Sequence, residues 1–211
     1  MFDYVHKSEF MPIKEELEQI IHRAQDIVRD KFTFSYRYIG SSNRNMITCD
    51  YNSNIGFDFD VNIYVNDDDE EYDAKEIKHI LMNAFNRAGS LAGYNPCEDS
   101  TRVFTMKFVD RKHSLIRHSC DFAIVHDFVD DERRDRQEYI RFNKKDYSYT
   151  WEDQPIGYDL SDKEDWLKNN NYWNDVRNCY IDKKNNNTDP DKKSRSLYAE
   201  AVNEVYNYYN S

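Results

Sequence analysis

Apolar and polar positions recur along this chain with two different periods. In residues 12–31 and again in residues 73–91, apolar residues return every three or four positions, which is the spacing of one face of an α-helix. We expect Pro12 in the first turn of the earlier helix, where its missing amide hydrogen costs little. Gly93 is expected to end the later helix.

The centre of the chain changes to the two-residue alternation of β-strands. The clearest case is residues 57–65 (FDFDVNIYV), where large apolar side chains point to one face and Asp58 and Asp60 point to the other, solvent-facing side. A small-residue turn, Gly40-Ser41-Ser42, follows an earlier strand. Further strands are expected at 32–39, 101–109 and 115–128, and a hairpin or edge strand at 139–151.

From Ser161 onward the pattern is helical again. Ser161 and Glu164 have the spacing of a capping box, and two helices are expected at 166–180 and 194–209. Helix, β-rich centre and helices together predict an α/β (α+β) fold with a mixed sheet covered by helices. We expect a core at residues 1–145 and a helical C-terminal extension at 146–211.

Composition narrows the class of protein. The chain has 211 residues and no apolar run near the roughly 18 residues of a membrane span, so we expect a soluble, cytoplasmic protein without membrane contact. Its 40 acidic and 29 basic residues give a net charge of -11. This sign argues against long nucleic acid as a substrate. It does not exclude a nucleoside triphosphate, because bound cations offset the local charge.

The chemistry is expected at the acids of the central strands. Asp58 and Asp60 are two residues apart on one strand face, so they lie roughly 7 Å apart. Carboxylates that leave water without a partner are costly, and Mg²⁺ binds carboxylate oxygens together with substrate phosphates. Such a pair alone also occurs on exposed strands. Asp121, however, is the lone acid in the apolar strand SCDFAIV, and it too needs a partner.

The order of these pieces resembles the polymerase β-like nucleotidyltransferases, whose signature is a strand ending in h-G-S, a strand h-D-h-D-h and a later strand h-D-h. Here they read Ile-Gly-Ser at 39–41, FDFDV at 57–61 and Cys-Asp-Phe at 120–122. The resemblance covers about residues 12–126. It implies a mixed-sheet nucleotidyltransferase core with two Mg²⁺ or Mn²⁺ ions. It assigns Asp58, Asp60 and Asp121 to metal binding and catalysis, and Gly40, Ser41 and Ser42 to nucleotide binding.

The resemblance implies transfer of a nucleoside monophosphate from a nucleoside triphosphate, with ATP preferred, to a hydroxyl acceptor. A small-molecule acceptor suits the chain length. The long segment between Ser42 and Asp58 is similar to the oligoadenylate-synthetase and cyclic-oligonucleotide-synthase branch, whose C-terminal helical half is usually larger. Synthesis of an oligonucleotide or cyclic dinucleotide is therefore one alternative, and a catalytically silent nucleotide-binding module is another.

Charges along residues 151–173 bear on the acceptor. An acidic segment there predicts a neutral or cationic hydroxyl compound, unless the acidity only keeps the surface soluble. Lys107 and Lys163 are candidate phosphate contacts. The acidic residues of the segment are Glu152, Asp153, Asp159, Asp162, Glu164 and Asp165.

Overall fold

The structure is a computed structural model that describes residues 1–67, 71–155 and 160–210. Two compact units can be distinguished. The sheet unit consists of Val5–Ile47 and Ser53–Gln154, and the helical unit consists of Met1–Tyr4, Thr48–Asn52 and Pro155–Ser211. The expected division into a core and an extension at residue 145 remains a functional prediction. By compactness, the sheet unit continues to Gln154.

The sheet unit contains a mixed sheet, as the sequence predicts. Its strand order begins β2-β4-β7. The first part of β7 pairs with β6, which pairs with β5, and the last part of β7 pairs with β8, which pairs with β9. β4 and β7 are parallel, and the other described pairs of this sheet are antiparallel. The strands are β2 (Thr33–Ile39), β4 (Ile55–Asn66), β5 (Glu98–Asp99), β6 (Phe104–Asp110), β7 (Leu115–Val129), β8 (Asp135–Asn143) and β9 (Ser148–Asp153).

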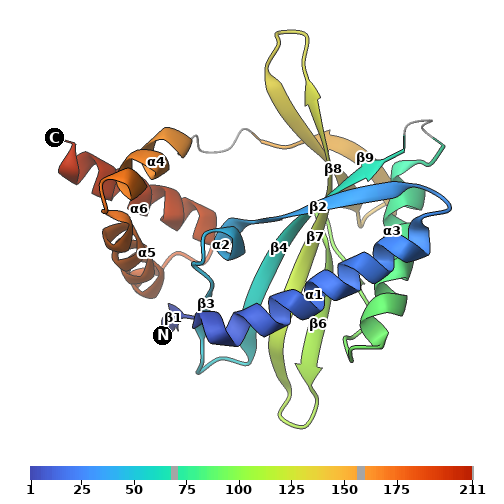
Figure 1. Cartoon of the computed structure of the whole chain (residues 1–211), viewed down its shortest axis with the longest axis horizontal. Helices are drawn as coiled ribbons and strands as arrows, with labels where there is room; N and C mark the ends of the chain where they lie inside the picture. The colour runs from blue at the N-terminus through green and yellow to red at the C-terminus, as the bar shows by residue number, and fades with distance from the viewer. Residues whose placement is uncertain (68–70, 156–159, 211) are drawn as a thin grey trace. The chain divides into compact units, whose positions relative to one another are not determined.

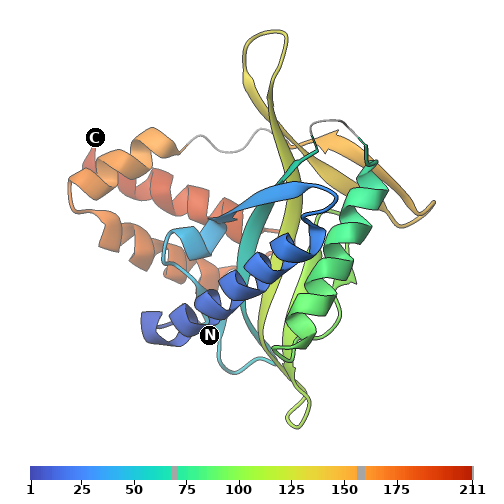
Figure 2. The same ribbon diagram turned by 45° about the vertical axis from the view of Figure 1, so that its right-hand side comes forward.

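Two long helices, α1 (Lys7–Val28) and α3 (Ala74–Ser90), pack together on one face of this sheet (Figures 1 and 2). The core beneath them is aromatic. The ring of Phe85 on α3 lies 5.3 Å from that of Phe104 and 4.5 Å from that of Phe122, and all three side chains are fully buried. Beyond this core, β7 and β8 extend as a two-stranded ribbon (Figure 1).

The start of α3 agrees with the sequence pattern, whereas the start of α1 does not. Asp73 and Glu76 form a reciprocal capping box at the start of α3, close to the expected boundary. α1 instead begins at Lys7, so Pro12 lies inside the helix and not in its first turn. The missing proline amide hydrogen leaves one helical bond unmade. Burial of Phe10, which is 2% exposed, stabilises the earlier turn.

In its described residues, the helical unit has two short strands and three helices. The expected helix at 166–180 is broken, because Asn171 adopts a left-handed φ of 64° between α4 and α5. The expected capping box also fails: Leu160 is the N-cap residue and makes no side-chain capping bond. The elements are β1 (Phe2–Tyr4) antiparallel to β3 (Thr48–Asp50), α4 (Ser161–Asn169), α5 (Trp173–Asn186) and α6 (Ser194–Tyr209). None of the described helices has the length and apolar character needed to cross a bilayer.

The aromatic core generates a stability prediction. Phe85→Ala removes a fully buried ring and should lower the free energy of unfolding by about 3–5 kcal/mol. The matched control is Leu91→Ala at the end of the same helix. Leu91 is 79% exposed, so its loss should change stability by less than about 0.5 kcal/mol. Urea denaturation of both variants measures the difference, and equal effects would contradict this account of the core.

Candidate active site

The two acids of β4 lie on the face of the sheet opposite the helices. Phe57, Phe59 and Val61 alternate with them and are buried in the core, so the strand has one apolar and one acidic face. The residue Asp58 is exposed, whereas Asp60 is half-buried. Their shared face is as expected, but Asp60 is more enclosed than a solvent-facing carboxylate.

The strand register brings Asp121 next to Asp60. The two residues are direct partners in the parallel β4–β7 pair, so their side chains leave the same face of adjacent strands, about 4.8 Å apart at the backbone. Asp58 is paired with Ser119. On the far side of β7, Thr105 of β6 is opposite Asp121, and its hydroxyl donates a hydrogen bond of 2.6 Å to Asp121 Oδ1.

The predicted glycine-serine turn reaches the same place. Ile39 is paired with Asp60, and the chain then turns into the short helix α2 (Gly40–Asn43). Gly40 has a φ of +62°, and a Cβ atom at this position would lie only 2.6 Å from Asp60 Oδ2. A side chain is therefore excluded both by backbone conformation and by the neighbouring carboxylate.

The two serines of this turn differ in their surroundings. Ser42 is 4% exposed, and its hydroxyl donates to the carbonyl oxygen of Ile39 at 2.9 Å. Ser41 is half-buried. The hydroxyl of Ser42 thus stabilises the turn, which leaves Ser41 as the better placed of the two side chains for a ligand. Nucleotide binding by Gly40, Ser41 and Ser42 remains a prediction.

Crowding of the acids changes their protonation. Burial, reinforced by the charges of Asp58 and Asp121, raises the pKa of Asp60 to about 7, although the charge of Arg44 opposes this shift. Burial also raises the pKa of Asp121, while the hydrogen bond from Thr105 and the charge of Lys107 lower it. Burial, together with the mutual charge of the acids, therefore favours the protonated form of Asp60 when no cation is bound.

No protein-family model matches the sequence, and no curated protein matches it. The structure, by contrast, is similar to solved enzymes. The cyclic AMP-GMP synthase DncV of Vibrio cholerae superposes with a TM-score of 0.61 at 13% identity, over 95% of this chain and 68% of that protein. The STING-associated c-di-GMP synthase CdnE of Capnocytophaga granulosa gives a TM-score of 0.62 at 16% identity, over 98% and 63%.

A third similar structure is the cyclic dinucleotide synthase CdnE of Elizabethkingia meningoseptica, with a TM-score of 0.54 at 11% identity over 92% of this chain and 69% of that protein. This chain has the polymerase β-like nucleotidyltransferase fold. The expected fold class is thereby confirmed, at identities that establish a shared fold and no more. The chain spans about two thirds of the length of these synthases.

The acids of this nucleotidyltransferase fold suit a divalent cation by their chemistry. Mg²⁺ and Mn²⁺ prefer oxygen ligands, and Asp58, Asp60 and Asp121 offer only carboxylate oxygens. The raised pKa of Asp60 reflects burial first and then the charges of Asp58 and Asp121, and a bound cation would offset both effects. Among the described residues, the side chains do not form a group of three or more placed to hold an ion. The register brings Asp60 and Asp121 together, with Asp58 one step along the same face.

The sequence does not place Thr105 and Arg44 beside these acids, and it offers Lys107 only as a candidate phosphate contact. Thr105 contacts Asp121 directly, and the charges of Lys107 and Arg44 act on the acids. The alternation of FTMKFVD shows that Thr105 and Lys107 share the polar face of their strand. The register that places this face beside Asp121 is not visible in the sequence.

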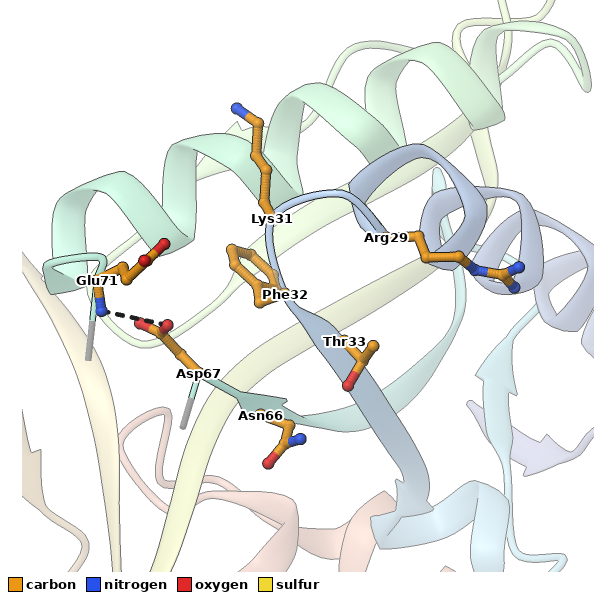
Figure 3. A pocket seen from close by; sticks show the side chains of 7 residues that line it. All are labelled: Arg29, Lys31, Phe32, Thr33, Asn66, Asp67 and Glu71. Atoms are coloured by element: carbon orange, nitrogen blue, oxygen red, sulfur yellow. Dashed lines mark hydrogen bonds between the residues drawn. The ribbon is translucent and has the colours of Figure 1, made fainter. Parts of the chain in front are cut away.

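A surface pocket of about 260 Å³ lies elsewhere in the sheet unit (Figure 3). The residues that line it include Thr33 and Asn66, which are partners in the β2–β4 pair. This pair lies six residues along β2 from the Ile39–Asp60 pair, which is a distance of about 20 Å. Figure 3 also shows Arg29 directing its charged end away from the acids of the pocket. The register at the acids identifies the candidate active site better than this hollow does.

The crowding generates a prediction about pH. In metal-free buffer, Asp60→Asn should stabilise the protein at pH 8 by about 2–4 kcal/mol and have little effect at pH 4. The folded state holds the Asp60 proton up to a pKa of about 7, whereas an unfolded aspartate loses it near pH 4. The contribution of Asp60 to stability therefore falls as the pH rises between these values, and the asparagine removes that loss.

Urea denaturation at pH 4, 6 and 8 measures this effect. Asp131→Asn, in the exposed β7–β8 turn, is the control and should be neutral at each pH. A gain for Asp60→Asn that does not depend on pH would contradict the assigned charge repulsion.

Proposed function

We propose that this chain is a metal-dependent nucleotidyltransferase whose acceptor is the hydroxyl of a second nucleotide, which makes it an oligonucleotide or cyclic-dinucleotide synthase. The observation that carries the proposal is the pairing of Asp60 with Asp121, beside Gly40, inside a fold shared with cyclic-dinucleotide synthases. Solved structures of the Vibrio cholerae synthase include complexes with GTP, with 3'-deoxy ATP and with the linear intermediate pppA(3',5')pG.

The proposed reaction joins the acceptor oxygen to the α-phosphorus of a nucleoside triphosphate, breaks the bond to the bridging oxygen and releases pyrophosphate. Mg²⁺ or Mn²⁺ held by Asp58, Asp60 and Asp121 would neutralise phosphate charge and make the acceptor hydroxyl more acidic. Gly40 lets the backbone approach the triphosphate closely, and Ser41 offers a hydroxyl to it. Asp121 would receive the acceptor proton in this proposal.

The small neutral or cationic acceptor that the sequence favoured has less support than a nucleotide. It rested on acidic residues, two of which are neutralised by arginines: Glu152 pairs with Arg141 at 3.2 Å, and Asp153 pairs with Arg136 at 2.7 Å. Asp159 lies outside the described residues. Three further acids, Asp162, Glu164 and Asp165, belong to the helical unit.

The strand order favours an acceptor that carries negative charge. With the triphosphate at Gly40 on the β2 side, in-line attack brings the acceptor from the opposite side, beyond Asp121. That side belongs to β6, whose Lys107 lies on the same face as Thr105. Its side chain is 28% exposed and pairs with Glu98 at 2.6 Å. An acceptor phosphate would compete well for this lysine, and a cationic acceptor would be repelled.

Turnover tests the proposal. Purified protein is incubated with Mn²⁺ or Mg²⁺ and each of the four ribonucleoside triphosphates, labelled at the α-phosphate, singly and in pairs. We expect pyrophosphate release and a labelled product that resists phosphatase, identified by mass spectrometry. Asp60→Asn and Asp121→Asn should each reduce the rate at least about 100-fold, because each removes a metal ligand.

Other results would contradict the proposal. Lys145→Ala in the exposed β8–β9 turn is the control variant, and its rate should equal that of the wild type. In a parallel reaction with added cell extract, nucleotide transfer only to a compound from the extract would indicate a small-molecule acceptor. Binding of metal and nucleotide without any turnover would indicate a silent module. An active enzyme with unchanged Asp60→Asn and Asp121→Asn variants would exclude this site.

Lys107 separates the two acceptor classes. Lys107→Met should raise the KM of the accepting nucleotide about 10–100-fold by removing a charge-assisted contact, while the KM of the donor changes little. Lys107→Arg keeps the charge and should retain most of the affinity. Steady-state kinetics identifies which substrate is affected. The concentration of the accepting nucleotide is varied, and a non-reactive donor analogue at constant concentration competes with the donor. An unchanged acceptor KM in Lys107→Met would remove the argument for an anionic acceptor at β6.

A further inference from the structure

We infer that Thr105 is a positioning residue for Asp121: its hydroxyl holds Oδ1 of the carboxylate, so that Oδ2 is left to face the ion and the acceptor. The inference rests on the proposed function. Thr105 Oγ1 lies 2.6 Å from Asp121 Oδ1 in a half-buried environment. This distance is typical of a hydroxyl that donates to an ionised carboxylate, the stronger class of hydrogen bond.

The backbone of Thr105 is fixed on both sides. On one side, it is directly opposite Asp121 in the β6–β7 pair, between the fully buried side chains of Phe104 and Met106. On the other side, it is paired with Glu98 of β5. A β-branched side chain on a fixed strand has few rotamers, so the hydroxyl has one well-defined direction.

A buried ion pair anchors β5 in turn. Lys78 of α3 is 1% exposed, and its Nζ lies 2.8 Å from Asp99 Oδ1 and donates to the carbonyl oxygen of Ser100 at 3.0 Å. The contact between Lys78 Nζ and Asp99 Oδ1 is an ion pair whose geometry is not that of a hydrogen bond. Tyr149 of β9 donates to the other oxygen of Asp99 at 2.7 Å. Separating such a buried pair is costly, so β5 and the strand beside it are held in place.

The acids of the site differ in this support. Among the described residues, none donates a hydrogen bond to the carboxylates of Asp58 or Asp60, whereas Asp121 has a dedicated donor. A carboxylate with one oxygen bound has one preferred orientation and one remaining oxygen. Outer-shell contacts of this kind orient metal ligands, and their loss typically lowers metal affinity or activity about 10–100-fold.

The test replaces the hydroxyl without changing the shape of the side chain. Thr105→Val removes the donor, Thr105→Ser keeps it, and Thr150→Val on β9 is an exposed control for the same exchange. Mn²⁺ affinity of the nucleotide-free protein is measured by electron paramagnetic resonance of the free ion. Steady-state kinetics then give kcat and KM with the nucleotide pair that the wild type uses.

We expect Thr105→Val to weaken Mn²⁺ binding about 10-fold and to lower kcat about 10–100-fold, with the KM of the donor nucleotide within about 3-fold of wild type. Thr105→Ser should restore both values to within about 3-fold, and Thr150→Val should match the wild type. This split between kcat and KM, with rescue by serine, is not expected of a general loss of stability.

Two results would overturn the inference alone: wild-type Mn²⁺ affinity and kcat in Thr105→Val, or equal losses in the valine and serine variants. The second result would assign the effect to packing of the whole side chain, because serine keeps the hydroxyl. A wild-type protein that neither binds Mn²⁺ nor releases pyrophosphate would overturn the proposed function and this inference with it.

Discussion

The parallel pairing of β4 with β7 sets two like charges side by side, and the other face of the same strands keeps them there. Asp60 and Asp121 are partners in this register, and so are Val61 and Phe122 on the apolar side. A slip by one residue would turn every apolar side chain of the strand outward and every acid into the core. Burial of one large apolar side chain contributes about 1.5–3 kcal/mol. Several such side chains therefore outweigh the repulsion between the carboxylates.

The carboxylates then constrain what can lie next to them. The close approach of Gly40 to Asp60 requires a residue without a Cβ atom, and the turn into α2 requires a positive φ at the same position. On the opposite side, Thr105 occupies one oxygen of Asp121. A backbone turn and a hydroxyl thus flank the acids on either side of β4 and β7. Both contacts follow from the strand order, since they come from the two strands that border this pair.

The sequence predicted the parts of this arrangement that depend on local pattern. The strands that carry Asp58, Asp60 and Asp121, the small-residue turn and the helix stripes all have clear periods, and the structure confirms these elements to within a few residues except at the start of α1. The strand order and register depend on contacts between distant segments, so Thr105 and Lys107 could not be placed beside Asp121. The short strands β1 and β3 have too few residues to show a period. The break at Asn171 depends on a left-handed backbone conformation. Asparagine tolerates this conformation, but its presence in a sequence does not predict it.

Net charge is a poor guide to what such a site accepts, because the field that a substrate meets is local. The chain as a whole carries a charge of -11. Near the acids, however, the charges of Arg44 and Lys107 oppose the rise that burial gives to the pKa values of Asp60 and Asp121. Exposed charges farther away than about 8–10 Å are screened at physiological salt, whereas groups in this half-buried site are screened less. With cations bound to the acids, the same face would change from repelling phosphate to attracting it. The net charge of -11 is therefore compatible with the proposed binding of two nucleotides, with the metal bound before or together with them.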